Sequence, residues 1–306
     1  MNAMSHEFSY ARALAASEKV NWRVEDIIGG DRRLDFSKPF MPEALARTAP
    51  LDALGAEAKL TLNHIRAYGY LYTFGLVEEF ILPFVLDHAR PMLAQDDVRT
   101  RALLRFAMEE AKHIHLFRTF KREFEAGFGT RCEMIGPADQ VASAVLAHHP
   151  LSVALLILQV EWMTQRHYLE SIRDNNGLDE QFKSLLRHHW MEEAQHAQLD
   201  TLMVEAIAAG CSAAEIDKAI DGYLEIGVMF DDAFKQQAAF DLDALHVKTG
   251  LQLEASQCEK VVAVQHQAMR WTYLGSGISH PNFLRSVDAL SPAQAARLAQ
   301  VAVDFS

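Results

Sequence analysis

Two stretches of this chain nearly repeat each other, and this repeat limits what the chain can fold into. Residues 105–117 read RFAMEEAKHIHLF, and residues 187–199 read RHHWMEEAQHAQL. Both contain Glu-Glu-Ala-x-His, and therefore Glu-x-x-His. Residues three positions apart lie on one face of a helix, so each glutamate and histidine can point at the same place. A single copy would be a weak signal, but two copies indicate a fold that brings two helices together at one centre.

Each Glu-x-x-His pair follows another glutamate at the same distance. Glu78 lies in TFGLVEEFILPF and precedes Glu110 by the same spacing at which Glu161, in LLILQVEWM, precedes Glu193. Both upstream glutamates lie in apolar segments, where an unpaired carboxylate is costly and needs a proton or a cation. The pattern Glu-x31-Glu-x-x-His therefore occurs twice along the chain. Four carboxylates and two imidazoles meeting inside a bundle would repel one another without metal, but they form a ligand set for two divalent ions.

The upstream glutamate of the first copy has an acidic neighbour, so two assignments stay open. The spacing that the two copies share favours Glu78. Glu79 is the alternative, because connections in the two halves can differ in length. If Glu78 faces the centre, we expect Glu79 to lie behind the ligands or to face the surface.

The two copies differ at one position on the same helix face. His189 lies four residues before Glu193, which gives His-x-x-x-Glu-x-x-His, whereas the equivalent residue of the first copy is Phe106. The second copy therefore offers one more nitrogen donor. The alternative is that His189 packs beside the centre without binding metal.

The remaining pattern predicts an all-α protein built on a ferritin-like four-helix bundle with additional C-terminal helices. No segment shows sustained alternation of apolar and polar residues, and helix start and stop signals bound the long apolar periodic segments. We expect an irregular N-terminal lead-in over residues 1–50 and further helices packed on the bundle over 211–306. The bundle itself is expected over residues 51–210, with long helices at about 52–89, 97–126, 151–174 and 179–210.

Charge and cysteine content narrow the partners and the compartment. The net charge of −12 argues against nucleic acid as a partner, because phosphate binding needs a basic surface. Residues 68–86 are apolar enough to suggest a membrane span, but two glutamates in the middle favour a buried helix of the protein core and no membrane. The three cysteines form no CxxC pair, which favours a reducing compartment, and we expect a cytoplasmic protein.

On these residues the chain resembles the ferritin-like di-iron oxygenases related to the p-aminobenzoate N-oxygenase family. That family has the order Glu, Glu-x-x-His, Glu, His-x-x-x-Glu-x-x-His. The segment VEEFILPF is also similar to the TEEALP segment of soluble acyl-carrier-protein desaturases, whose first glutamate binds metal. The resemblance covers about residues 70–200. It implies seven metal ligands: Glu78 (with Glu79 as the alternative), Glu110, His113, Glu161, His189, Glu193 and His196.

The resemblance also implies a function. We expect two iron ions, with manganese or a mixed iron and manganese pair as alternatives, and no catalytic residue beyond the ligands. The expected partners are O₂, a small organic substrate and an electron donor, in a homodimer. N-oxygenation of an amine is the specific reaction implied. The alternatives are a ferroxidase or iron store and a desaturase-like enzyme. Neighbours of the ligands in the sequence either pack in the core, as such residues usually do, or line an apolar pocket: Phe106, Phe117, Trp162, Met163 and Trp190.

Overall fold

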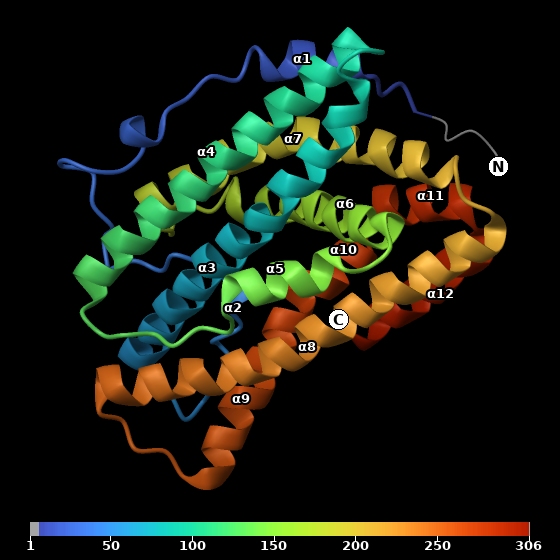
Figure 1. Cartoon of the computed structure of the whole chain (residues 1–306). Helices are drawn as coiled ribbons and strands as arrows, with labels where there is room; N and C mark the ends of the chain where they lie inside the picture. Colours follow the sequence, from blue (N-terminus) through green and yellow to red (C-terminus); the bar gives the residue numbers. More distant parts are fainter. Residues whose placement is uncertain (1–5, 306) are drawn as a thin grey trace.

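The structure is a computed structural model that describes residues 6–305 (Figure 1). Helices make up the regular secondary structure of this range, and its only bridge between extended segments joins Gly29 and Arg32. The prediction of an all-α fold is confirmed.

Four long helices form the bundle, and they pack as two pairs (Figure 1). Helix α3 lies along α4, α6 lies along α7, and α4 contacts α7 between the pairs. One helix of each pair carries the single glutamate and the other carries Glu-x-x-His, which is the ferritin-like arrangement. The four helices are α3 (Ala56–Ala89), α4 (Asp97–Phe128), α6 (Pro150–His167) and α7 (Glu180–Ala208).

Side-chain caps set where the bundle helices begin. The carboxylate of Asp96 accepts a hydrogen bond from the backbone N–H of Arg99 at 2.9 Å, and Asp179 accepts one from Phe182 at 2.6 Å. These bonds satisfy backbone donors that have no partner inside the helix. Helix α6 is followed by a π-helical turn, Tyr168–Ile172, so the segment predicted as one helix to residue 174 changes its winding at residue 168.

The C-terminal third of the chain packs against the bundle. Helix α8 (Ala213–Thr249) begins with a capping box at Ser212 and contacts both α3 and α6. After it come α9 (Ala255–Arg270), a π-helical turn (Trp271–Gly275) and three shorter helices. These are α10 (Ser276–Ile278), α11 (Pro281–Leu290) and α12 (Pro292–Asp304). The face of α3 and α6 that points away from α4 and α7 is thereby covered.

The N-terminal part of the chain covers a different face. It contains α1 (Tyr10–Ser17), a 3₁₀ turn (Val24–Asp26) and α2 (Glu43–Ala46). Helix α1 packs against both α4 and α7 and lies across their outer side (Figure 1). Between α4 and α6, the short helix α5 (Ala138–Leu146) packs against α3.

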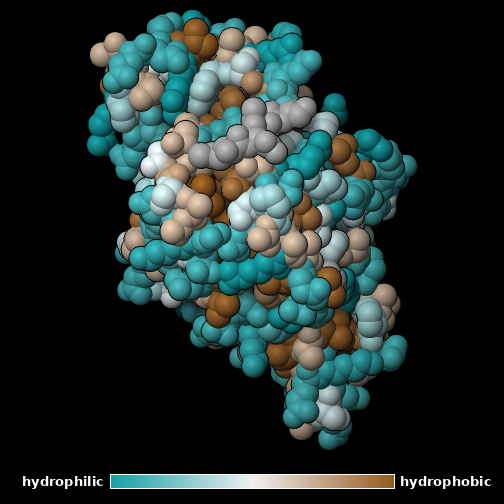
Figure 2. Space-filling view, turned by 90° about the vertical axis from the view of Figure 1, so that its right-hand side faces the viewer, coloured by the Kyte–Doolittle hydropathy of each residue, from teal (hydrophilic) through white to brown (hydrophobic). Residues whose placement is uncertain are grey.

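Helix α3 is the most apolar of the long helices. With the turn after it, Ala56–Met92, it is long and apolar enough to cross a membrane by length and composition. However, 67% of its most apolar window is buried inside the protein, as in the central helix of a bundle. The molecular face shown in Figure 2 is mostly hydrophilic, with apolar residues scattered among the polar ones.

Candidate metal centre

All seven predicted ligands lie inside the bundle and are at most 3% exposed. Helix α3 supplies Glu78, and α6 supplies Glu161. The other five come from the two helices that carry the repeated motif, namely Glu110 and His113 from α4 and His189, Glu193 and His196 from α7. Each helix buries its ligands because they lie on its apolar, inward-facing side.

The side chains form two overlapping groups that could each hold a metal ion. In each group, four ligand atoms lie within 4.8 Å of one another. His113 and Glu193 belong to both groups, so the two candidate positions are adjacent and share two residues. The first group adds Glu78 and His189, and the second adds Glu110 and His196.

The first group is centred on His189. Its Nε2 atom lies 2.6 Å from Glu193 Oε1 and 3.1 Å from Glu78 Oε1. His113 Nδ1 lies 3.1 Å from the same oxygen of Glu193. The structure therefore places Glu78 at the centre. Glu79, by contrast, keeps a side chain that is 33% exposed and forms an ion pair with Arg118 at 2.7 Å.

The second group is centred on His196. Its Nδ1 atom lies 2.8 Å from Glu110 Oε1 and 3.0 Å from Glu193 Oε2. Glu161 is in neither group of four, but its carboxyl group interacts with that of Glu193. Burial, followed by the charge of Glu193, raises the pKa of Glu161 well above its ordinary value. Glu161 is 2% exposed and is the carboxylate that α6 contributes beside Glu193.

Several buried polar atoms of the predicted ligands lack a hydrogen bond among the described residues. Glu110 Oε1, Glu193 Oε1 and His113 Nδ1 are within ion-pair distance of another member of the centre, but the Oε2 atoms of Glu78, Glu110 and Glu161 have neither a hydrogen bond nor an ion pair within the described range. Buried polar atoms without partners are costly, and divalent cations would satisfy these. Carboxylate and imidazole donors without thiolate suit iron and manganese. The residues present therefore fit two such ions.

Two further glutamates, Glu109 and Glu192, hold the histidines crosswise, and the sequence reasoning missed them. His196 Nε2 donates to Glu109 at 3.0 Å, and His113 Nε2 donates to Glu192 at 2.9 Å. Each glutamate thus holds the histidine of the other motif. Such a bond fixes the ring and the tautomer, which leaves Nδ1 facing the centre. We call Glu109 and Glu192 the bracing carboxylates; the doubled glutamate in both motifs was the available signal.

The three histidines of the centre differ in their affinity for protons, because burial lowers the pKa of His189 whereas the neighbouring carboxylates raise that of His113 and His196. Burial lowers the pKa of His113, but the carboxylates of Glu193 and Glu192 outweigh burial and raise this pKa to about 9. Burial also opposes protonation of His196, whose pKa the charges of Glu193 and Glu110 nevertheless raise well above the ordinary value. Metal ions need these nitrogens deprotonated, so metal binding would release protons.

A further buried carboxylate, Asp200, lies one helical turn after His196. Neither of its oxygens has a hydrogen-bond partner among the described residues. Burial raises the pKa of Asp200 well above its ordinary value; the charges of Glu110 and Glu193 add to the rise, and His196 opposes it. The repeat gave no signal for Asp200, because the equivalent residue of the first copy is Phe117.

Only one of the five residues expected around an apolar pocket lines the cavity beside the centre. That residue is Met163. Phe106 stacks on His196 with 4.1 Å between ring centroids, and Phe117 meets His189 edge to face at 5.0 Å. The two tryptophans stack on rings outside this cavity. The phenylalanines therefore pack on the histidine rings, and four of the five residues follow the core-packing alternative and do not line this cavity.

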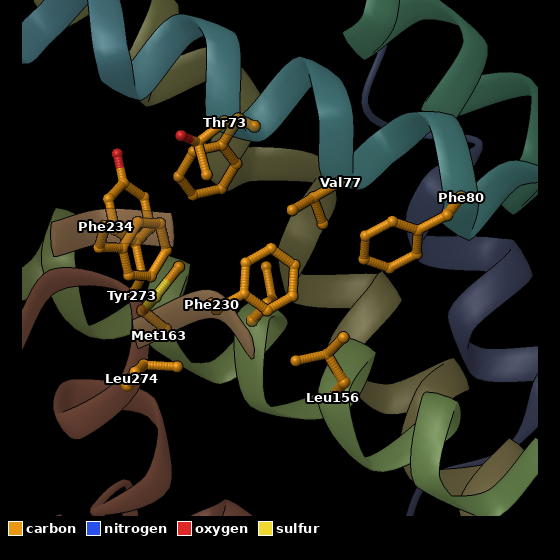
Figure 3. Close-up of a pocket in the computed structure, with 11 residues that line it drawn as sticks. Thr73, Val77, Phe80, Leu156, Met163, Phe230, Phe234, Tyr273 and Leu274 are labelled. Atoms are coloured by element: carbon orange, nitrogen blue, oxygen red, sulfur yellow. The ribbon is translucent and has the colours of Figure 1, made fainter. Parts of the chain in front are cut away.

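The cavity lies between α3 and α6, and residues of α8 and of the π-helical turn Trp271–Gly275 also line it (Figure 3). Its volume, measured for the centre of a water-sized sphere, is about 20 Å³, which is room for about one water molecule. Val77 and Val160 line it and directly precede Glu78 and Glu161 in the chain. The complete lining is Thr73, Phe74, Val77, Phe80, Leu156, Val160, Met163, Phe230, Phe234, Tyr273 and Leu274. The cavity is thus apolar, and Phe74 of its lining meets the ring of His189 edge to face with 5.3 Å between centroids.

Comparisons with known proteins give a likeness in fold only. No family model and no curated protein matches the chain. Among solved structures, the chain is similar to a variant of an R2-like ligand-binding oxidase with an Fe/Fe cofactor (14% identity, TM-score 0.48). A second variant of that oxidase, with a Mn/Fe cofactor, gives 14% identity and a TM-score of 0.49. Both alignments cover 89% of this chain and 94% of the other. These values carry no argument about activity, and the assignment of the centre rests on its own geometry.

Proposed function

We propose that this protein is an O₂-dependent dinuclear metal oxidase or oxygenase that acts on a small organic molecule. The observation that carries this proposal is a pair of buried carboxylate and histidine groups that share His113 and Glu193, beside an apolar cavity. Two iron ions are the preferred occupants, with manganese at one or both positions as the alternative.

The protein's own residues would fix the positions of the metal ligands, keep water away from the centre and hold the histidine rings in one orientation. Glu193 and His113 lie between the two positions, and the remaining ligands complete each one from a different helix. The bracing carboxylates keep Nδ1 of His113 and His196 directed at the centre. When bound, the ions supply the electrons that reduce O₂. Inserting one oxygen atom and releasing the other as water requires two electrons and two protons, so an external electron donor is part of the proposal.

The side chains that line the cavity indicate which class of substrate would bind there. Its walls are aliphatic and aromatic side chains, apart from Thr73 and Tyr273 at one end (Figure 3). None of the described residues that line it is charged, so a charged group in the substrate would lose its hydration without a partner. The cavity has room for about one water molecule, so a larger substrate would bind only after side chains of the lining move. We therefore expect an uncharged molecule that is mainly apolar; an uncharged aromatic amine undergoing N-oxygenation is the specific form that the additional histidine favours.

O₂ consumption by the iron-loaded full-length protein, with a chemical reductant and a panel of uncharged apolar compounds, tests this function. We expect oxidised product and continued O₂ uptake over many turnovers. An iron store would instead oxidise far more than two ferrous ions per chain without a reductant and deposit ferric mineral. That outcome, or the absence of O₂ uptake in protein that holds two iron ions, would contradict the proposal.

A further inference from the structure

We propose that residues 9–22, here called the N-terminal strap, position the histidines of the centre through the bracing carboxylates. Ser17 and Trp22 are the positioning residues. This inference uses the metal-binding part of the proposed function and is independent of any activity toward O₂.

Ser17 holds the bracing carboxylate of α4. It is the last residue of α1 and is 3% exposed. Its hydroxyl donates a short hydrogen bond to Glu109 Oε1, while Glu109 Oε2 accepts from His196. Arg105 Nε donates to the Ser17 hydroxyl at 2.9 Å and to Glu109 at 3.2 Å. The Glu109 carboxylate is therefore fixed from the side opposite the histidine, so its orientation depends on the strap.

Trp22 plays the corresponding part on the side of α7. Its ring lies nearly parallel to that of His113, with an angle of 8° and 6.1 Å between centroids. The ammonium group of Lys112 lies 3.9 Å from the centroid of the Trp22 ring and forms a short ion pair with Glu192. Glu192 in turn accepts from His113. Trp22 therefore covers the cation that holds the second bracing carboxylate.

The strap matters because both bracing carboxylates lie next to the protein surface. Glu109 and Glu192 are at most 1% exposed, but the side chains of Arg105 and Lys112 are 28% and 21% exposed. Water entering here would compete for the carboxylates and weaken their bonds to the histidines. A helix as short as α1 has little stability of its own, so it stays in place through its packing on α4 and α7.

Cobalt(II) binding to the purified full-length protein tests the inference without O₂. We expect Ser17→Ala and Trp22→Leu to weaken Co(II) binding by about tenfold to a hundredfold and to shift the visible ligand-field bands. Thr119→Ala, which removes an exposed hydroxyl on α4 that donates to its own helix at His115, is the control and should bind like the wild type. Trp22→Phe keeps an aromatic cover and should recover most of the affinity.

A double-variant cycle separates positioning from general support of the fold. If Ser17 acts through Glu109, Ser17→Ala should have little further effect on Co(II) affinity in a Glu109→Gln protein. Equal effects in both backgrounds, or wild-type affinity and spectra in folded Ser17→Ala and Trp22→Leu proteins, would overturn the inference. A wild-type protein that binds no metal would instead contradict the proposed function.

Discussion

The two helix pairs carry the same motif at the same spacing, but they present different chemistry to the centre. Along one face of α7 lie His189, Glu193, His196 and Asp200. At the equivalent positions of the first copy, α4 carries Phe106, Glu110, His113 and Phe117. The inner two positions match in type, and the outer two exchange polar groups for phenylalanine.

The phenylalanines of α4 pack against the histidines of α7 across the bundle. Phe106 of α4 stacks on His196 of α7, and Phe117 meets His189. The aromatic rings of one helix thus pack on the polar residues of the other, which lets a charged centre sit in a close-packed interior. Each candidate metal position has two histidines and two glutamates in its group of four, but the position beside Glu110 and His196 also lies near the buried carboxyl group of Asp200. We infer that the two positions differ in metal affinity.

Removing the residue that both positions share should have the largest effect. Glu193→Ala should reduce bound metal from about two ions per chain to about none, because each group of four loses a ligand. Elemental analysis of anaerobically loaded protein measures this. Glu110→Ala serves as the matched variant, since it belongs to one group only; similar losses in both variants would show that Glu193 is not shared.

Making the second half resemble the first should affect one position. His189→Phe copies Phe106 into α7 and removes a donor from the group that contains Glu78. We expect the affinity at that position to fall by about a hundredfold while the other position keeps its metal, as followed by stepwise ferrous titration. Unchanged binding at both positions would place His189 outside the ligand set.

Variants of the two bracing carboxylates show whether each of them supports its histidine to the same extent. Glu109→Gln and Glu192→Gln should each lower metal affinity by about tenfold, because each weakens the bond to one histidine. Calorimetric titration of the two variants compares them directly. An effect in one variant only would show that only one of the two hydrogen bonds, from His196 to Glu109 or from His113 to Glu192, contributes to metal binding.

Asp200, where the first half has phenylalanine, should make the stability of metal-free protein depend on pH. Its pKa is raised in the folded state, so the folded protein keeps a proton that the unfolded chain loses above its ordinary pKa of 3.8. The free energy of unfolding therefore falls as pH rises, by up to about 1.4 kcal/mol per pH unit. Above about pH 5, where the unfolded chain has lost this proton, the fall should be smaller in Asp200→Asn, as measured by urea unfolding. Equal slopes would contradict the assignment.

Glu79, adjacent to Glu78 in the chain, should give the smallest effect. Glu79→Ala removes a partly exposed ion pair with Arg118, and such pairs contribute about 0–1 kcal/mol. Metal content should match the wild type, whereas Glu78→Ala should lose metal. Loss of metal in Glu79→Ala, measured by the same elemental analysis, would reverse the assignment of the two residues.

The sequence predicted the parts of this protein that depend on local pattern. The four long helices and the meeting of both motifs follow from helical periodicity and spacing. The cavity lining did not follow, because Phe230, Phe234 and Tyr273 come from helices far along the chain whose placement no motif fixes. Ser17 and Trp22 were missed for the same reason, since their contacts with the centre are made only by tertiary packing.

The most direct test of the dinuclear centre is a crystal structure of iron-loaded protein with anomalous diffraction at the iron edge. We predict two anomalous peaks inside the bundle, one beside Glu78 and His189 and one beside Glu110 and His196, with Glu193 and His113 between them. A single peak, or no peak among these side chains, would contradict the conclusion that the two repeated motifs form one dinuclear site.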